Sequence, residues 1–227
     1  MRRLALSAAL LIGCAGAPPR AASPAASTTP PDTEPIARLP EAPTSPPPPS
    51  DGAAALARAF EARMTVWTRP DGSRVLTRRC REGPVDCAAR IARFAQLIDE
   101  TARRHDLDPF LLAALAWRES GLDPSALGRR GEAGIVQLHP RGAGRDMRYV
   151  RDAAYRAQCQ SELDACQGPV LERGAETLAR AIEECGSLVS GLGAYATGHC
   201  TESARHPQQV LEERENLRRL AEDPAAN

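Results

Sequence analysis

The stretch AWRESGLDPSALGRRGEAGIVQLHP, residues 116–140, joins the end of an apolar segment to a glycine-rich loop. The run before its first charge, PFLLAALAW (109–117), has no ionisable side chain and suits burial. Asp108, with the proline after it, is typical of a helix start, and Gly121 is typical of a helix end. The sequence therefore predicts a buried helix that carries Glu119 to the edge of the core.

Glu119 has two interpretations. At the C-terminal end of a helix a carboxylate faces the unfavourable end of the helix dipole, and apolar neighbours disfavour its charge further. A carboxyl group that keeps its proton in a cleft is the general acid that cleavage of a glycosidic bond needs. The simpler alternative is a helix-terminal glutamate that points into water. The residue alone does not decide between these two.

The segments around this stretch indicate a compact, mostly α domain. Apolar residues at helical spacing, together with end signals, predict further helices at 54–64, 87–106, 149–158, 170–186, 187–198 and 206–223. Alternation around a PDG turn signal predicts a small N-terminal β-hairpin within 65–80. GIVQLHP, residues 134–140, is too short for more than a turn or two of helix.

The motifs in these segments have a known counterpart. RESGLDPSALGRRGEAGIVQLHP resembles the signature of the soluble lytic transglycosylase (SLT) family, the goose-lysozyme-like enzymes that cut bacterial peptidoglycan. In that family a Glu-Ser pair ends a helix, an Asn/Asp-Pro-x-Ala turn follows, and G-x-x-G-L-M-Q-L-x-P comes next. GLGAYATG (191–198) is similar to the family's A-x-A-Y-N-A-G. The resemblance covers about residues 91–198 and implies an α+β lysozyme-like fold.

The resemblance also implies roles. Glu119 would protonate the oxygen between N-acetylmuramic acid and N-acetylglucosamine, and would then take a proton from the C6 hydroxyl of the muramoyl residue, which closes a 1,6-anhydro ring. Ser120 and Gln137 would hydrogen-bond the substrate, and Tyr195 would lie across the cleft and orient Glu119 or a sugar. The alternatives are a helix-end hydroxyl for Ser120, a solvated side chain for Gln137 and a core residue for Tyr195.

An ordinary hydrolase would need a second carboxylate. Asp123 and Glu132 are the nearest candidates in the sequence. Asp123 precedes a proline in a turn, where bonding of the local backbone is its expected role, and Glu132 lies in a glycine-flanked loop that suits exposure. We therefore expect a peptidoglycan lytic transglycosylase, a lyase, and not a hydrolytic muramidase.

Two features depart from the family's pattern. Ala196 stands where the family has asparagine, so the hydrogen bonds of that amide are missing or come from another residue such as Thr197. The tyrosine that these enzymes often carry in a later helix is absent, since no tyrosine follows Tyr195. A catalytically weak or inactive relative, acting as a glycan-binding or envelope-assembly lipoprotein, therefore stays open as the alternative.

The cysteines of the sequence predict disulfide bonds. Six follow the N-terminal region: Cys80, Cys87, Cys159, Cys166, Cys185 and Cys200. An even number in an exported chain indicates disulfides, and the low entropic cost of closing short loops favours pairing each cysteine with its neighbour, as 80–87, 159–166 and 185–200. No C-x-x-C occurs and the histidines are scattered, so we expect no metal site.

Composition limits the expected partners. Lys and Arg together number 29, as do Asp and Glu, so no excess of positive charge indicates nucleic acid. The chain contains no lysine, which excludes a Walker-type phosphate loop and Schiff-base chemistry. We expect peptidoglycan glycan strands as the ligand, no cofactor and no nucleic acid; the sequence identifies no protein partner.

The N-terminus has the plan of a bacterial export signal. MRRLALSAALLIGC (1–14) has two arginines, an apolar run and then a cysteine, and LIGC is similar to a lipobox, in which cleavage leaves Cys14 lipidated. An ordinary signal peptide with an incidental cysteine is the alternative. Ala15, where aspartate would favour inner-membrane retention, favours an outer-membrane anchor facing the periplasm.

The predicted organisation follows from these parts. Residues 1–13 form a lipoprotein signal peptide, and the Pro/Ala/Ser/Thr-rich segment 14–53 is a disordered tether, because it cannot bury enough apolar surface to offset its ordering entropy. Residues 54–87 form a helix and hairpin that precede the domain, and residues 88–222 form the lysozyme-like transglycosylase domain.

Overall fold

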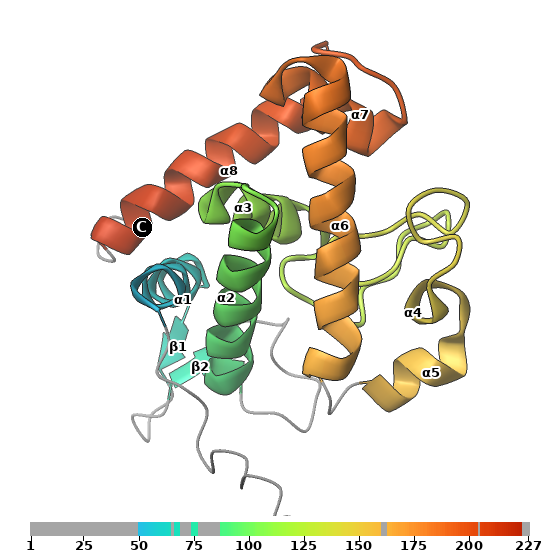
Figure 1. Cartoon of the computed structure of the whole chain (residues 1–227). Coiled ribbons are helices and arrows are strands. Elements are labelled where there is room, and N and C mark those ends of the chain that lie inside the picture. Colours follow the sequence, from blue (N-terminus) through green and yellow to red (C-terminus); the bar gives the residue numbers. More distant parts are fainter. Residues whose placement is uncertain are drawn as a thin grey trace, which may run out of the picture. The chain divides into compact units, whose positions relative to one another are not determined.

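The computed structural model describes residues 50–64, 66–68, 74–76, 87–159, 163–203 and 205–223. This part of the chain is mostly helical, as predicted, and its elements are shown in Figure 1. They are α1 (Asp51–Arg63), β1 (Val66–Thr68), β2 (Arg74–Leu76), α2 (Cys87–Arg104), α3 (Pro109–Ser120), α4 (Arg148–Arg151), α5 (Ala153–Gln158), α6 (Leu163–Cys185), α7 (Leu188–Thr197) and α8 (Arg205–Glu222).

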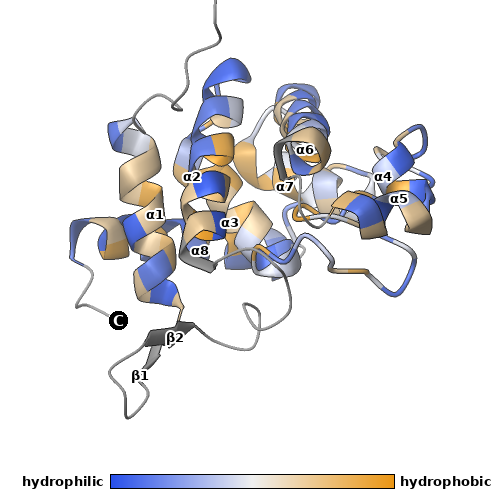
Figure 2. Ribbon diagram, turned by 90° about the horizontal axis from the view of Figure 1, so that it is seen from below, coloured by the Kyte–Doolittle hydropathy of each residue, from blue (hydrophilic) through white to orange (hydrophobic). Residues whose placement is uncertain are grey.

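Helix α3 is the buried helix that the sequence predicts. Residues 111–116 are all buried, and α3 packs against α1, α2 and α8. Its start is fixed by Asp108, whose side chain accepts a hydrogen bond of 3.0 Å from the backbone N–H of Phe110. Its end is fixed by Gly121, which adopts a φ of 63° and donates its N–H to the carbonyl of Trp117. Hydrophilic residues lie mainly on the outer surfaces of the surrounding helices (Figure 2).

Helix α1 belongs to the same core. Leu56 and Phe60 are fully buried, and α1 packs against α2 and α8. The helix begins at Asp51, within the segment predicted as tether, because the side chain of Ser50 caps it by accepting a hydrogen bond from Ala53 N. The Ser50 hydroxyl also donates to Asp99 of α2 at 2.6 Å. Residues 51–63 are therefore a packed part of the fold, which differs from the predicted boundary.

Helix α6 begins earlier than predicted and packs closely on α7. It starts at Leu163, where the sequence predicted a start at residue 170, and continues through Pro169. Proline removes one helical hydrogen bond to the carbonyl four residues before it, and both Pro169 and Ala165 are exposed, so this carbonyl lies on the solvent side. A Cβ at Gly191 of α7 would lie 2.7 Å from Cα of Ile182, so glycine permits the close approach of these two helices.

The smaller elements confirm one prediction and correct another. Strands β1 and β2 pair in antiparallel register, with Val66 opposite Leu76, as the hairpin prediction requires. The single helix predicted at 149–158 is instead two short helices, α4 and α5. The break falls at Asp152, which leaves the helical region with a φ of −112° and a ψ of 107° and caps α5 by accepting a hydrogen bond from Tyr155 N.

Two of the predicted disulfides are present. Cys159 is bonded to Cys166, and Cys185 to Cys200, with Cα atoms 5.7 and 5.5 Å apart. The predicted Cys80–Cys87 pair lies outside the residues whose side chains the structure describes, as do the predicted signal peptide and most of the predicted tether. Among the described helices, none combines the length and apolar character that a membrane span requires.

Candidate active site

Glu119 meets a histidine from the far end of the chain. It lies in the last turn of α3, and its Oε1 is 2.7 Å from Nε2 of His206, which lies in the first turn of α8. The side chains of Glu119 and His206 are 21% and 25% exposed. This partial burial agrees with the expected position at the edge of the core and disfavours the interpretation of Glu119 as a glutamate that simply points into water.

A tight turn lies beside Glu119 where the sequence analysis predicted a turn or two of helix, and that prediction is wrong. Residues 134–137 connect Ala133 to Leu138, which pair with each other as an antiparallel bridge. Gly134 and Gln137 have φ values of 83° and 47°, in the left-handed region that a right-handed helix does not contain. At Gly134 a Cβ would also lie 2.7 Å from a methyl group of Val170 in α6, so glycine is needed there for space as well.

Ser120 ties the end of α3 to this turn. Its hydroxyl lies 3.2 Å from the carbonyl of Ala116, one turn back in the helix, and 2.8 Å from the carbonyl of Ile135. The structure therefore shows Ser120 as a helix-end hydroxyl, and its contact with Ile135 holds the turn beside Glu119.

Tyr195 holds the next residue of the turn from α7. Its hydroxyl donates to the carbonyl of Val136 at 2.8 Å. Burial, and then the neighbouring negative charge of Glu119, hold the pKa of Tyr195 well above its usual value, so the phenol keeps its proton. The Tyr195 side chain is therefore in electrostatic reach of Glu119, while its hydrogen bond goes to the backbone of the turn.

The side chain of Gln137 stabilises the turn by hydrogen bonds to backbone carbonyls. Its side-chain nitrogen Nε2 donates to the carbonyl of Ala126 at 3.0 Å and to that of Gly134 at 2.9 Å. A primary amide has two N–H groups, and both are used here. Ser120, Gln137 and Tyr195 are thus brought together around one turn next to Glu119, each with its donor group on a backbone carbonyl.

We expect Tyr195→Phe to lower the free energy of unfolding by about 1 kcal/mol, because it removes one hydrogen bond to the buried Val136 carbonyl. Urea denaturation followed by circular dichroism measures the change. Tyr155→Phe is the matched control, since the Tyr155 hydroxyl lies 3.8 Å from the sulfur of Cys166 and its loss should cost less. Equal destabilisation by the two variants would contradict a special role for the Tyr195 contact.

The comparison with protein families decides the classification. The transglycosylase SLT domain matches residues 96–216, which is more than half of the 227-residue chain. The chain belongs to this family. The matched range contains Glu119, Ser120, Gln137, Tyr195 and His206. Membership confirms the predicted SLT resemblance and the lysozyme-like fold, and it supports peptidoglycan cleavage of the transglycosylase type. Neither curated proteins nor solved structures gave a match.

Within this SLT domain the hydroxyl of Thr197 does not replace the amide of the family's asparagine. Ala196 is exposed. The hydroxyl of Thr197, considered above as a replacement for that amide, lies 2.8 Å from the carbonyl of Gly193 and 3.1 Å from that of His199. It therefore serves the C-terminal end of α7 itself.

The two other carboxylates near Glu119 in the sequence accept hydrogen bonds from residues of their own loops. Asp123 accepts hydrogen bonds from the backbone N–H and the hydroxyl of Ser125, which confirms its expected local role. Glu132 accepts a hydrogen bond of 2.9 Å from Arg130 N. Burial raises the pKa of Glu132, but hydrogen bonds from backbone N–H groups and the nearby His139 and Arg130 outweigh it and hold the pKa below its usual value. Glu132 is therefore unsuited to donate a proton.

His206 is the site residue that the sequence analysis missed. The tyrosine expected in a later helix is absent, and α8 brings this histidine to the acid instead. The two residues are 87 positions apart. The only sequence signal is a histidine in the first turn of a predicted amphipathic helix, which does not identify its partner. In the part of the chain that the structure describes, no group of His, Cys, Asp or Glu side chains could hold a metal ion.

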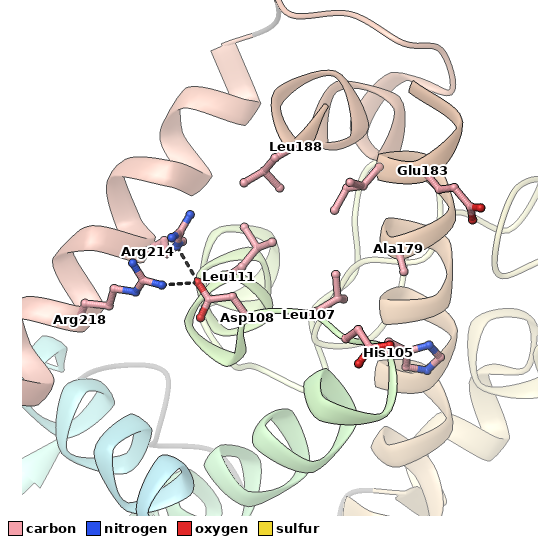
Figure 3. A pocket seen from close by; sticks show the side chains of 11 residues that line it. His105, Leu107, Asp108, Leu111, Ala179, Glu183, Leu188, Arg214 and Arg218 are labelled. Atoms are coloured by element: carbon pink, nitrogen blue, oxygen red, sulfur yellow. Dashed lines mark hydrogen bonds and ion pairs between the residues drawn. The ribbon is translucent and has the colours of Figure 1, made fainter. Parts of the chain in front are cut away.

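A separate hollow lies at the opposite end of α3. It has a volume of about 460 Å³ and is lined by residues 105–108, which precede α3, and by residues of α3, α6, α7 and α8 (Figure 3). Asp108 is 2.7 Å from both Arg214 and Arg218 of α8, so one carboxylate forms ion pairs with two arginines. Since Asp108 precedes α3 and Glu119 is near its end, about 16 Å of helix separates them. The hollow is not part of the candidate active site, but its ion pairs hold α8 against α3.

Proposed function

We propose that this protein is a lytic transglycosylase that cleaves the MurNAc–GlcNAc β-1,4 bond of peptidoglycan and forms a 1,6-anhydromuramoyl product. The observation that carries the proposal is the position of Glu119. Its carboxyl group is partly buried at the end of a buried helix, hydrogen-bonded at one oxygen, and inside the range that matches the SLT domain. The other carboxylates of the adjoining loop, Asp123 and Glu132, are bound to local donors.

The proposed reaction needs one carboxyl group. Glu119 donates its proton to the glycosidic oxygen as the bond from that oxygen to C1 of the muramoyl residue breaks. The C6 hydroxyl oxygen of the same residue bonds to C1, and its proton passes to Glu119, which returns to its starting state. The nucleophile belongs to the substrate, so the reaction consumes no water and needs no second carboxylate, in contrast to hydrolysis.

Ser120, Gln137 and Tyr195 are proposed to contact the sugar as acceptors. Each already uses its N–H or O–H groups on a backbone carbonyl: Ser120 on Ile135, Gln137 on Ala126 and Gly134, and Tyr195 on Val136. Their oxygen atoms retain lone pairs. The groups of the substrate that they would bind are therefore donors, namely hydroxyl groups or the N–H of an acetamido group.

One observation favours the second candidate, a weak or inactive relative that binds glycan or supports an envelope assembly. Ala196 is exposed and cannot form the hydrogen bonds of the family's asparagine, and the Thr197 hydroxyl is hydrogen-bonded within α7.

Incubation of the purified chain with peptidoglycan distinguishes the two candidate functions. A transglycosylase releases 1,6-anhydromuropeptides, detected by mass spectrometry. Retention on sedimented peptidoglycan without any soluble product would instead support the second candidate.

We also propose that the protein is exported and anchored in the cell envelope through lipid on Cys14. Cys14→Ala removes the modified residue, and we expect the variant to leave the membrane fraction, because the acyl chains provide the membrane affinity. Fractionation of cells that express each form, followed by immunoblotting, measures this. Membrane partitioning that is unchanged in Cys14→Ala would contradict the lipoprotein assignment and leave an ordinary signal peptide.

A further inference from the structure

We propose that His206 is a positioning residue that donates its Nε2–H to Oε1 of Glu119 and thereby leaves Oε2 as the oxygen that exchanges protons with the substrate. This inference rests on the proposed function, because it assigns the two oxygens of the proposed acid. Its basis is the 2.7 Å contact between Nε2 and Oε1 and the surroundings of the imidazole ring.

The contact is held by the packing of two helices. Helix α3 packs along α8, and Arg118 of α3 donates to the side chain of Gln209 of α8 at 2.8 Å, close to the Glu119–His206 pair. At the other end of α3, Asp108 is bound to Arg214 and Arg218. Since both ends of α3 are fixed to α8, the distance between the ring and the carboxyl group does not depend on the side chains of Glu119 and His206 alone.

The second ring nitrogen indicates the tautomer. Nδ1 of His206 is buried and has no hydrogen-bond partner among the residues that the structure describes. A proton on Nδ1, as in the other neutral tautomer or in imidazolium, would bury an N–H donor without an acceptor. In the first turn of α8 the imidazolium form would also place a positive charge at the positive end of a helix dipole. The neutral Nε2–H tautomer instead places the ring's one N–H where an acceptor lies.

This tautomer suits an acid that must release and regain a proton. With Nε2–H bound to Oε1, the proton of Glu119 resides on Oε2 and is not shared with the ring. When Glu119 gives up that proton, the hydrogen bond from His206 gains a charged acceptor and becomes stronger. The contact therefore stabilises the state formed during the reaction more than the starting state, which is the condition for an effect on kcat.

Kinetics of variants in the full chain test the positioning role. We expect His206→Ala to lower kcat about ten- to a hundredfold with KM changed less than about twofold, because the lost donor acts mainly on the charged carboxylate. His206→Gln can place an N–H near the position of Nε2, and we expect it to recover most of the activity. His105→Ala is the matched control, since it removes another histidine–glutamate contact of 2.7 Å, to Glu172, at a distance from Glu119.

Nitrogen NMR of the full chain labelled with ¹⁵N-histidine tests the tautomer without any substrate. The chain has four histidines, so single variants assign the signals. At neutral pH we expect His206 to show a protonated Nε2 and an unprotonated Nδ1. Protonation of both nitrogens, or of Nδ1 alone, would overturn the assignment of the two Glu119 oxygens.

The outcomes separate the inference from the function on which it rests. Activity in Glu119→Gln, or no cleavage by the wild-type chain, would refute the proposed function and the inference with it. An inactive Glu119→Gln together with a His206→Ala variant of wild-type kcat would refute the role of His206 alone. If His206→Ala unfolds, as circular dichroism would reveal, the kcat of His206→Gln and the NMR result decide.

Discussion

We expect Glu119→Gln to abolish peptidoglycan cleavage and to leave the fold intact. Glutamine keeps the shape of the side chain and an oxygen that can accept the hydrogen bond from His206, but it has no proton to transfer. A positioned general acid contributes about a hundred- to ten-thousandfold in rate, and here one group serves as both acid and base. The loss is measured as release of soluble muropeptides by the wild type and the variant.

Glu132→Gln is the matched control for this experiment. Glu132 lies on the loop that follows α3 and has its carboxylate on the backbone of Arg130, so its neutralisation should leave activity within about threefold of wild type. Thermal unfolding curves that coincide for both variants and the wild type would exclude misfolding as the cause. A Glu119→Gln enzyme with wild-type activity would remove Glu119 from the mechanism.

The second large effect is expected from the Cys185–Cys200 disulfide. The bond joins cysteines 15 residues apart in the sequence, so it closes a loop and restricts the unfolded chain. Its removal by Cys185→Ser with Cys200→Ser should destabilise the protein by about 3 kcal/mol. For a protein of this size that is roughly 10 °C in Tm, measurable by calorimetry. The loop contains α7, so the contact of Tyr195 with the Val136 carbonyl should loosen and activity should fall as well.

Cys159→Ser with Cys166→Ser is the control for that activity loss. This bond joins residues seven positions apart, between α5 and α6, and none of the Glu119, Ser120, Gln137 or Tyr195 contacts involves it. We expect this variant to lose a similar amount of stability but less activity than the variant without the Cys185–Cys200 bond. We expect the same result when the predicted Cys80–Cys87 pair is removed. If both variants lose the same fraction of activity below their melting temperatures, the Cys185–Cys200 bond has no specific role at the site.

The features that could be predicted from the sequence are those whose physical cause lies within a few residues along the chain. The limits of α3 follow from Asp108 and Gly121, which act on the adjacent backbone, and the disulfides formed between near neighbours because short loops cost little entropy to close. The start of α6 was missed because Pro169 is a strong local signal against helix, while packing around the helix outweighs it.

The details of the site were less predictable because they depend on contacts between distant segments. The conformation of the 134–137 turn needs a left-handed Gln137, whose cost is offset by hydrogen bonds to Ala126 and Gly134 that no local pattern indicates. The Glu119 motif could be recognised because its residues are adjacent. His206 could not be recognised, because it contacts Glu119 only when α8 packs on α3.

We propose that Glu119 cleaves the glycan with the substrate's own hydroxyl as the nucleophile. Digestion of purified peptidoglycan in water enriched in ¹⁸O, followed by mass spectrometry of the muropeptides, tests it most directly. We expect products with 1,6-anhydromuramoyl ends that carry no ¹⁸O, formed by the wild type and not by Glu119→Gln. Products with reducing muramoyl ends that contain one ¹⁸O atom would show that water is the nucleophile and would contradict the claim.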